Sequence, residues 1–243
     1  MWDALAGVLA GQTAQTGRPV LEIVDAGGGT GGFAVPLAEL GHTVTVVDPS
    51  PDALAALERR AAEADVTGRV VALQGDLAAL PGLVGTERAD IVLCHGVLEV
   101  VDDPAGAVAA LAKCLRTGGS VSVLVSNKNA AVLTRALAGR FAEARHALED
   151  KDGRFGVLDP LPRRFTCDGA AALLASAGFA VTAVHGVRVF TDLVPAALVA
   201  GEQRAVAGEQ RAQEELVQLE IAASTHPAMR EVAAQLHLLA RRR

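Results

Sequence analysis

The glycine-rich segment at residues 25–32, DAGGGTGG, constrains the fold more than any other part of the sequence. It lies between an apolar run, Val20 to Ala26, and a segment with helical spacing, Phe33 to Leu40. Glycines at such a junction let the backbone turn sharply and approach a ligand that a Cβ atom would exclude. The segment therefore predicts a strand, a loop and a helix, with a cofactor bound over the loop.

Short apolar runs alternate with amphipathic segments up to about residue 125. We expect helices from Pro51, capped by Ser50, to about Ala64 and from Pro104 to Leu115. Because strands that alternate with helices indicate a parallel sheet covered on both faces, we expect a doubly wound α/β fold. It has seven strands, mostly parallel, with an antiparallel last strand. The expected strands are 20–26, 43–48, 69–74, 90–95, 120–125 after a Gly118-Gly119 turn, 180–189 and 234–240.

The regular alternation ends after Ser126. Residues 126–168 are expected to form a helical and loop insertion for substrate recognition, inside a single domain of residues 1–243. One helix is expected from Ala130 to about Leu148, another from Cys167 to Ala177, and a long one over 196–224. The sequence VAGEQRA occurs at 199–205 and again at 206–212, and we assign it no function.

The sequence is typical of a cytoplasmic protein. The N-terminus lacks a basic stretch followed by a long apolar run, and no run of about 18 uncharged apolar residues occurs. We therefore expect no membrane contact. Cys94, Cys114 and Cys167 are widely spaced, so we expect reduced core cysteines and neither disulfides nor a metal site.

The glycine segment fits two cofactor patterns. One is the dinucleotide fingerprint GxGxxG, at Gly27, Gly29 and Gly32; the other is the (D/E)xGxGxG pattern of S-adenosylmethionine (SAM) enzymes, at Asp25, Gly27, Gly29 and Gly31. Asp48, about twenty residues further on, suits the ribose hydroxyls of either cofactor, although it could be only a loop carboxylate.

Three further features favour SAM over a nicotinamide cofactor. The Asp25 carboxylate would attract the ammonium of a methionine moiety but repel a pyrophosphate. Asp76 and Leu77 follow the third strand, where class I methyltransferases contact adenine; alternatively, Asp76 caps a short helix. The turn at 115–119, LRTGG, resembles the LRPGG turn of those enzymes. His95, which ends the fourth strand, is expected to line the cofactor pocket or to be a satisfied buried histidine.

Four segments resemble one narrower family, the bacterial tRNA 5-carboxymethoxyuridine methyltransferases. They are DAGGGTGG at 25–32, CHGVLEVVDDP at 94–104, the segment 126–141, and GVRVFTDL at 186–193. The resemblance implies methyl transfer from SAM to the carboxylate of 5-carboxymethoxyuridine at the tRNA wobble position. It also implies the SAM contacts Gly27, Gly28, Asp48, Asp76, Leu77 and His95. The family's N-terminal SAM-contacting arginine, which precedes a tryptophan matching Trp2, has no counterpart here, so a version extended at the N-terminus is expected to bind SAM more tightly.

The implied chemistry needs a cation more than a base. A carboxylate is ionised near neutral pH and can attack the methyl group directly, so the enzyme has mainly to orient the reactants. Arg188 is our first candidate to hold that carboxylate, ahead of Arg140, Arg163 and Arg164, because a guanidinium binds oxyanions in a fixed fork. Arg188 could instead be a surface residue. Two alternative functions remain open: a small-molecule O- or N-methyltransferase, and a non-catalytic SAM-binding protein.

The charge distribution limits how RNA could bind. The net charge of −6 and the 3% of aromatic residues are not typical of a general nucleic-acid binder. Residues 126–192, however, contain nine basic and seven acidic residues, and five of the seven aromatic ones. We therefore expect modest, salt-sensitive tRNA binding confined to residues 126–192.

Overall fold

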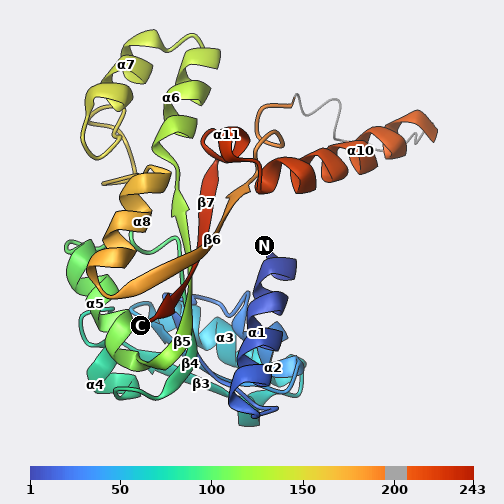
Figure 1. The fold of residues 1–243 in the computed structure, drawn as a ribbon, viewed down its shortest axis with the longest axis vertical. Helices are drawn as coiled ribbons and strands as arrows, with labels where there is room; N and C mark the ends of the chain where they lie inside the picture. Colours follow the sequence, from blue (N-terminus) through green and yellow to red (C-terminus); the bar gives the residue numbers. More distant parts are fainter. Residues whose placement is uncertain (195–206) are drawn as a thin grey trace. The chain divides into compact units, whose positions relative to one another are not determined.

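Seven strands form one sheet in the order β3-β2-β1-β4-β5-β7-β6 (Figure 1). The computed structural model describes residues 1–194 and 207–243. The sheet is mostly parallel and its last strand is antiparallel, which confirms the expected α/β class. The strands are β1 Glu22–Ala26, β2 Thr43–Asp48, β3 Val70–Gln74, β4 Ala89–His95, β5 Leu115–Ser126, β6 Phe179–Val187 and β7 Gln235–Arg242.

The helices follow the strands along the chain in the expected alternation. Ser50 caps α3 as predicted, because its Oγ accepts a hydrogen bond from the Ala53 backbone N–H at 3.2 Å. The helices described are α1 Trp2–Thr16, α2 Ala34–Glu39, α3 Pro51–Glu63, α4 Leu80–Val84, α5 Pro104–Cys114, α6 Lys128–Leu137, α7 Phe141–Glu149, α8 Cys167–Ser176, α10 Ala207–Ser224 and α11 Pro227–Arg230, with a 3-10 turn at Thr67–Arg69. None of these helices is long and apolar enough to cross a membrane.

The chain divides into two compact units. The first contains residues 1–124, 170–183 and 238–243; the second contains residues 125–169 and 184–237. In the first unit, leucines of α1, α2 and α3 pack with alternate residues of β1, β2 and β4 in one buried cluster that includes Leu5, Leu37, Leu57 and Ile23. This cluster fixes the three helices on one face of the strands that carry the glycine loop.

The register of the parallel strands aligns their carboxyl ends. Ala26 pairs with Val47, and Asp48 pairs with Gln74. His95, the last residue of β4, pairs with Leu124. The glycine loop, Asp48, the segment after β3 and His95 therefore meet at one edge of the sheet, where α/β proteins bind their ligands.

Some expectations about the elements were wrong or incomplete. The single helix expected from Ala130 to Leu148 is two helices, because Gly139 adopts a left-handed φ of 72° after α6. Gly118 and Gly119 do not precede β5 but lie inside it, at a shift in its register with β4. Helix α1 was not expected from the sequence. Of the helix expected over 196–224, residues 207–224 are helical; its start and most of the VAGEQRA repeat lie outside the described residues.

Candidate functional site

The glycine loop packs tightly against the end of β1. The Gly27 N–H donates to the Val47 carbonyl at 2.7 Å, and Gly27 has a left-handed φ of 77°. A Cβ atom on Gly28 would lie 2.5 Å from Oδ2 of Asp25. Because no side chain fits at that distance, the loop backbone lies directly over the Asp25 carboxyl group. Gly27 and Gly28 are thus required by the local geometry.

Asp48 organises the loop through both carboxylate oxygens. Its Oδ2 accepts from the Gly29 N–H and its Oδ1 from the Ser50 N–H, each at 2.9 Å. The residue is buried, and each oxygen retains a further lone pair for a hydroxyl donor. Asp48 is therefore both a structural carboxylate of the loop and a fixed acceptor, so the two alternatives for it are not exclusive.

Asp25 is a carboxyl group that is costly to ionise. It is 2% exposed, and its Oδ2 has no hydrogen-bond partner in the described part of the chain. Burial, and secondly the charge of Asp48, raise the pKa of Asp25 from 3.8 to about 7. A buried carboxyl group with an unused oxygen beneath the glycine loop is suited to a cationic ligand group.

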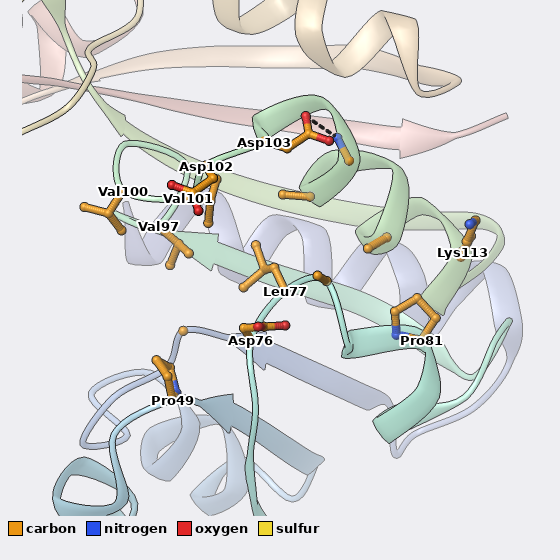
Figure 2. Close-up of a pocket in the computed structure, with 15 residues that line it drawn as sticks. Pro49, Asp76, Leu77, Pro81, Val97, Val100, Val101, Asp102, Asp103 and Lys113 are labelled. Atoms are coloured by element: carbon orange, nitrogen blue, oxygen red, sulfur yellow. Dashed lines mark hydrogen bonds between the residues drawn. The ribbon is translucent and has the colours of Figure 1, made fainter.

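A cavity of about 570 Å³ lies beside the glycine loop (Figure 2). Gly27, Asp76 and Leu77 line it, together with Val97 from the loop after β4. Oδ1 of Asp76 accepts from the Ala79 N–H at 2.9 Å, which closes the turn before α4; Asp76 does not cap that helix, whose N-cap is Ala79. Figure 2 shows Asp76 and Leu77 on one side of the cavity, with Val97 across from Leu77.

Three rings form a row at the end of β4. The Phe33 ring lies 4.7 Å from the His95 ring, edge to face, and 4.9 Å from the Trp2 ring. His95 Nε2 and the Ser122 hydroxyl are 2.9 Å apart. Burial lowers the pKa of His95 to about 4, so its imidazole is neutral near pH 7. His95 therefore fits a wall better than a charged group.

Arg188 lies in the second unit, just after β6. Its φ is 55°, an uncommon left-handed conformation for a residue with a side chain. Its Nε is 3.5 Å from Oδ2 of Asp192, and its side chain is 51% exposed. The described arrangement thus presents an accessible guanidinium that is only loosely paired.

Glu220 of α10 holds the loop that follows Arg188. Its carboxylate accepts from the N–H groups of Val189, Phe190 and Thr191 at 2.7–2.9 Å, and from the Thr191 hydroxyl at 2.7 Å. Although burial opposes it, these hydrogen bonds lower the pKa of Glu220. The consecutive N–H groups form a concave anion site that Glu220 itself fills.

The other candidate arginines differ in how strongly they are paired with carboxylates of the protein. The Arg164 guanidinium binds both oxygens of the buried Asp159 carboxylate, so it is a structural residue. Arg140 is more than half exposed and lies 3.6 Å from Glu143. Arg163 interacts with other residues of the protein. Arg140 and Arg188 are thus both about half exposed and loosely paired, whereas Arg164 is held within the fold.

The structure brings most of the predicted cofactor residues together in the first unit. Asp25 is the next-to-last residue of β1, and the others end or follow strands at the same edge of the sheet: Gly27, Gly28, Gly29, Asp48, Asp76, Leu77 and His95. Only Gly27, Asp76 and Leu77 line the cavity itself. Phe33 and Glu220 were not predicted as site residues. Phe33 could have been found because it directly follows the glycine loop, whereas Glu220 has no local sequence signal.

Comparison with known proteins gives a consistent result. Residues 24–123 match the methyltransferase domain family. The tRNA 5-carboxymethoxyuridine methyltransferase of Escherichia coli K12 is 31% identical over 195 residues, which cover 79% of this chain and 70% of that protein. The ubiquinone biosynthesis O-methyltransferase of Thiobacillus denitrificans is 35% identical over 120 residues, covering 49% of this chain and 50% of its own. The magnesium protoporphyrin IX methyltransferase of Synechocystis PCC 6803, solved with bound S-adenosylhomocysteine, shares the fold with a TM-score of 0.61, 16% identity, and coverage of 99% and 83%.

Proposed function

The chain belongs to the class I SAM-dependent methyltransferases, and on this premise we propose that it methylates the carboxylate of 5-carboxymethoxyuridine in the tRNA wobble position. Membership of this family makes the protein a SAM-dependent enzyme and removes the nicotinamide alternative. The methyl acceptor and the roles of individual residues belong to the proposal.

The extent of sequence similarity carries the proposal. The match to the tRNA methyltransferase covers 195 residues, whereas the methyltransferase domain accounts for residues 24–123. An alignment of that length extends into the second unit, which contains the candidate insertion and Arg188. The match to the ubiquinone enzyme covers only 120 residues. Similarity beyond the cofactor domain supports a shared acceptor.

We assign the cofactor contacts from the residues at the sheet edge. The loop backbone at Gly27, Gly28 and Gly29 has no Cβ atoms to exclude the methionine end of SAM. Asp48 keeps acceptor capacity for the ribose hydroxyls, while Asp76 and Leu77 line the cavity for adenine. The unpartnered Asp25 oxygen suits the ammonium group, and neutral His95 forms a wall. These residues therefore fit the charged, polar and aromatic parts of SAM.

The acceptor chemistry requires orientation more than proton transfer. Bound SAM would supply a methyl group on a positively charged sulfur. A bond forms between the acceptor oxygen and the methyl carbon as the carbon–sulfur bond breaks, and the electron pair of the broken bond stays on sulfur. The acceptor carboxylate is already ionised, so no residue has to act as a general base. Arg188 would hold that carboxylate by two N–H donors, and Glu220 would keep the Arg188 loop in place. Correct orientation alone can be worth about 7–11 kcal/mol.

A methyl-transfer assay tests the proposal. The protein is incubated with methyl-labelled SAM and tRNA that carries 5-carboxymethoxyuridine, with the same tRNA lacking the modification as the control. We expect base-labile label, as in an ester, only in the modified tRNA. Arg188→Gln should lower kcat/KM by about tenfold or more without changing SAM affinity. If Arg188→Gln has the same kcat/KM as the wild-type protein, Arg188 does not hold the acceptor carboxylate. If no label appears in modified tRNA, the proposed acceptor is wrong.

A small-molecule O-methyltransferase is the second candidate. The similarity to ubiquinone biosynthesis O-methyltransferases favours it, since half of this chain matches one of them. Catechol or phenol acceptors added to the same assay would then receive the label in place of tRNA.

A further inference from the structure

A second pocket, of about 190 Å³, lies wholly inside the second unit. Residues at the start of α6 line it, as do Phe155 and Arg164 of the segment after α7, and Asp192 of the loop after β6. It shares no lining residue with the larger cavity beside the glycine loop. Arg135 of α6 also lines this second pocket, and the sequence analysis gave Arg135 no role.

Arg135 is held on an aromatic support. Its Cζ atom lies 3.6 Å from the centre of the Phe155 ring, and Arg164 Cζ lies 5.2 Å from the same ring. Arg164 is only 9% exposed and bonds to the Asp159 carboxylate and the Gly153 carbonyl, so the support is rigid. A guanidinium stacked on a ring loses little freedom and keeps its in-plane N–H donors for another ligand.

Among the described residues, the four guanidiniums nearest the pocket have one carboxylate fewer than they would need for one-to-one pairing. Four guanidiniums share three carboxylates: Arg164 pairs with Asp159, Arg188 with Asp192, and Arg135 and Arg140 share Glu143. Glu143 lies 3.2 Å from Arg135 and 3.6 Å from Arg140, and more than a third of its side chain is exposed. A ligand oxyanion could replace Glu143 at Arg135, because Glu143 would keep Arg140 as its partner.

We propose that this pocket binds an oxyanion of the acceptor, and that Arg135 is the binding residue. The inference rests on the proposed function, because the tRNA acceptor offers two oxyanions of this chemistry: the carboxylate of the modified uridine and a backbone phosphate. Two polar side chains at the pocket donate to backbone carbonyls: the Thr134 hydroxyl to Ala130 and the Asn127 amide to Ala233. The positive charge that would bind an oxyanion in this pocket therefore comes from Arg135. Arg188 then contacts the pocket only through Asp192.

Arg135→Gln tests this site, with Arg145→Gln as the matched control. Arg145 is exposed on α7, lines neither pocket and carries the same charge. We expect Arg135→Gln to raise KM for modified tRNA about tenfold, with SAM affinity unchanged and only a small change in Arg145→Gln. Arg135→Lys, which keeps the charge but loses the stacked fork, should restore only part of the affinity. Equal KM in the two glutamine variants would overturn the proposal.

Binding of unmodified tRNA, measured by fluorescence anisotropy, separates the two oxyanions. A backbone phosphate is indicated if Arg135→Gln also weakens unmodified tRNA about tenfold relative to Arg145→Gln. The uridine carboxylate is indicated if only the modified tRNA is affected, in which case Arg135 holds that carboxylate in place of Arg188. Both results support an oxyanion site at Arg135.

A third measurement keeps this inference distinct from the proposed acceptor. If the wild-type protein does not methylate modified tRNA, the proposed function fails, but the pocket can still be tested with inorganic phosphate. Thermal stabilisation by phosphate, relative to chloride at equal ionic strength, should then persist in Arg145→Gln and be lost in Arg135→Gln. Equal stabilisation in both variants, or none in the wild-type protein, would overturn the oxyanion site.

Discussion

Asp25 places an acidic group where burial opposes its charge. Its folded pKa is about 7, against 3.8 ordinarily, so the folded protein keeps a proton that the unfolded chain releases at lower pH. This contribution to the free energy of unfolding is fully present below about pH 4 and is lost as the pH rises to 7. The difference in unfolding free energy between the wild-type protein and Asp25→Asn should therefore decrease over that range and stay constant above it.

Urea denaturation at a series of pH values provides the measurement. Asp52→Asn, which removes an exposed carboxylate at the start of α3, is the control and should leave the pH dependence unchanged. Curves for wild type and Asp25→Asn that run parallel from pH 4 to 8 would contradict a raised pKa at this position.

Trp2 offers a direct optical report on the cofactor side of the molecule. It is the single tryptophan, the chain has no tyrosine, and its ring packs on Phe33 next to the glycine loop. We expect the emission of Trp2 to change in intensity on titration with SAM, because a cation placed near the ring row interacts with the aromatic faces. S-adenosylhomocysteine, which lacks the sulfonium charge, should give a smaller change. If calorimetry shows that the protein is saturated with SAM and the Trp2 emission has not changed, Trp2 lies away from the cofactor.

How well single residues could be predicted depended on their distance along the chain. Asp48 and Asp76 could be identified because each ends or directly follows a strand whose end is visible in the sequence. The hydrogen bonds from Val189 and Thr191 to Glu220 join residues about thirty positions apart, and no periodicity connects them. Likewise, nothing local indicates that Arg135 stacks on Phe155.

At the scale of elements, the Glu220 carboxylate joins α10 to the loop after β6, where Ala223 of α10 also packs with Val189. Glu220→Gln leaves an acceptor oxygen but introduces an amide that cannot accept all four hydrogen bonds. We expect a loss of about 1–3 kcal/mol in unfolding free energy and a raised KM for modified tRNA. Because Glu220 lies outside the first unit, SAM affinity measured by calorimetry should not change.

Glu214→Gln is the control on the same helix, since Glu214 is exposed and carries the same charge. Its stability and KM should remain close to those of the wild-type protein. If Glu220→Gln and Glu214→Gln behave alike, Glu220 does not position the Arg188 loop. Glu220→Asp, which keeps the charge but shortens the side chain, should raise KM less than Glu220→Gln does.

Most elements of the first unit, α1 excepted, could be predicted closely because hydrophobic periodicity and the turn residues at strand ends agree there. β2 has the bounds that the TVTVVD run predicts, and α3 begins at its predicted cap. The insertion could not be divided in the same way. The amphipathic pattern continues through both α6 and α7, and only the left-handed conformation of Gly139 separates them. A glycine inside a helical pattern does not by itself indicate such a break.

At the scale of the whole molecule, the acidic total conceals a difference between segments. The chain carries a net charge of −6, yet residues 126–192 have nine basic and seven acidic side chains. A polyanion would therefore be repelled by most of the protein and attracted locally. This distribution makes the salt dependence of tRNA binding a test of where the RNA binds.

We expect tRNA affinity, measured by anisotropy, to fall with increasing salt with a shallow slope of about −2 in log K against log salt, as for roughly three phosphate contacts. SAM affinity over the same range should change little, because its contacts are partly buried.

Charge reversal at one residue tests where the RNA binds. Lys151→Glu in the insertion should weaken tRNA binding about threefold or more and leave SAM affinity unchanged. Arg59→Glu, an exposed residue of α3 with the same charge change, should have a smaller effect because it lies outside residues 126–192. Equal weakening by both substitutions would show that tRNA senses only the net charge of the protein, and would contradict binding at the insertion.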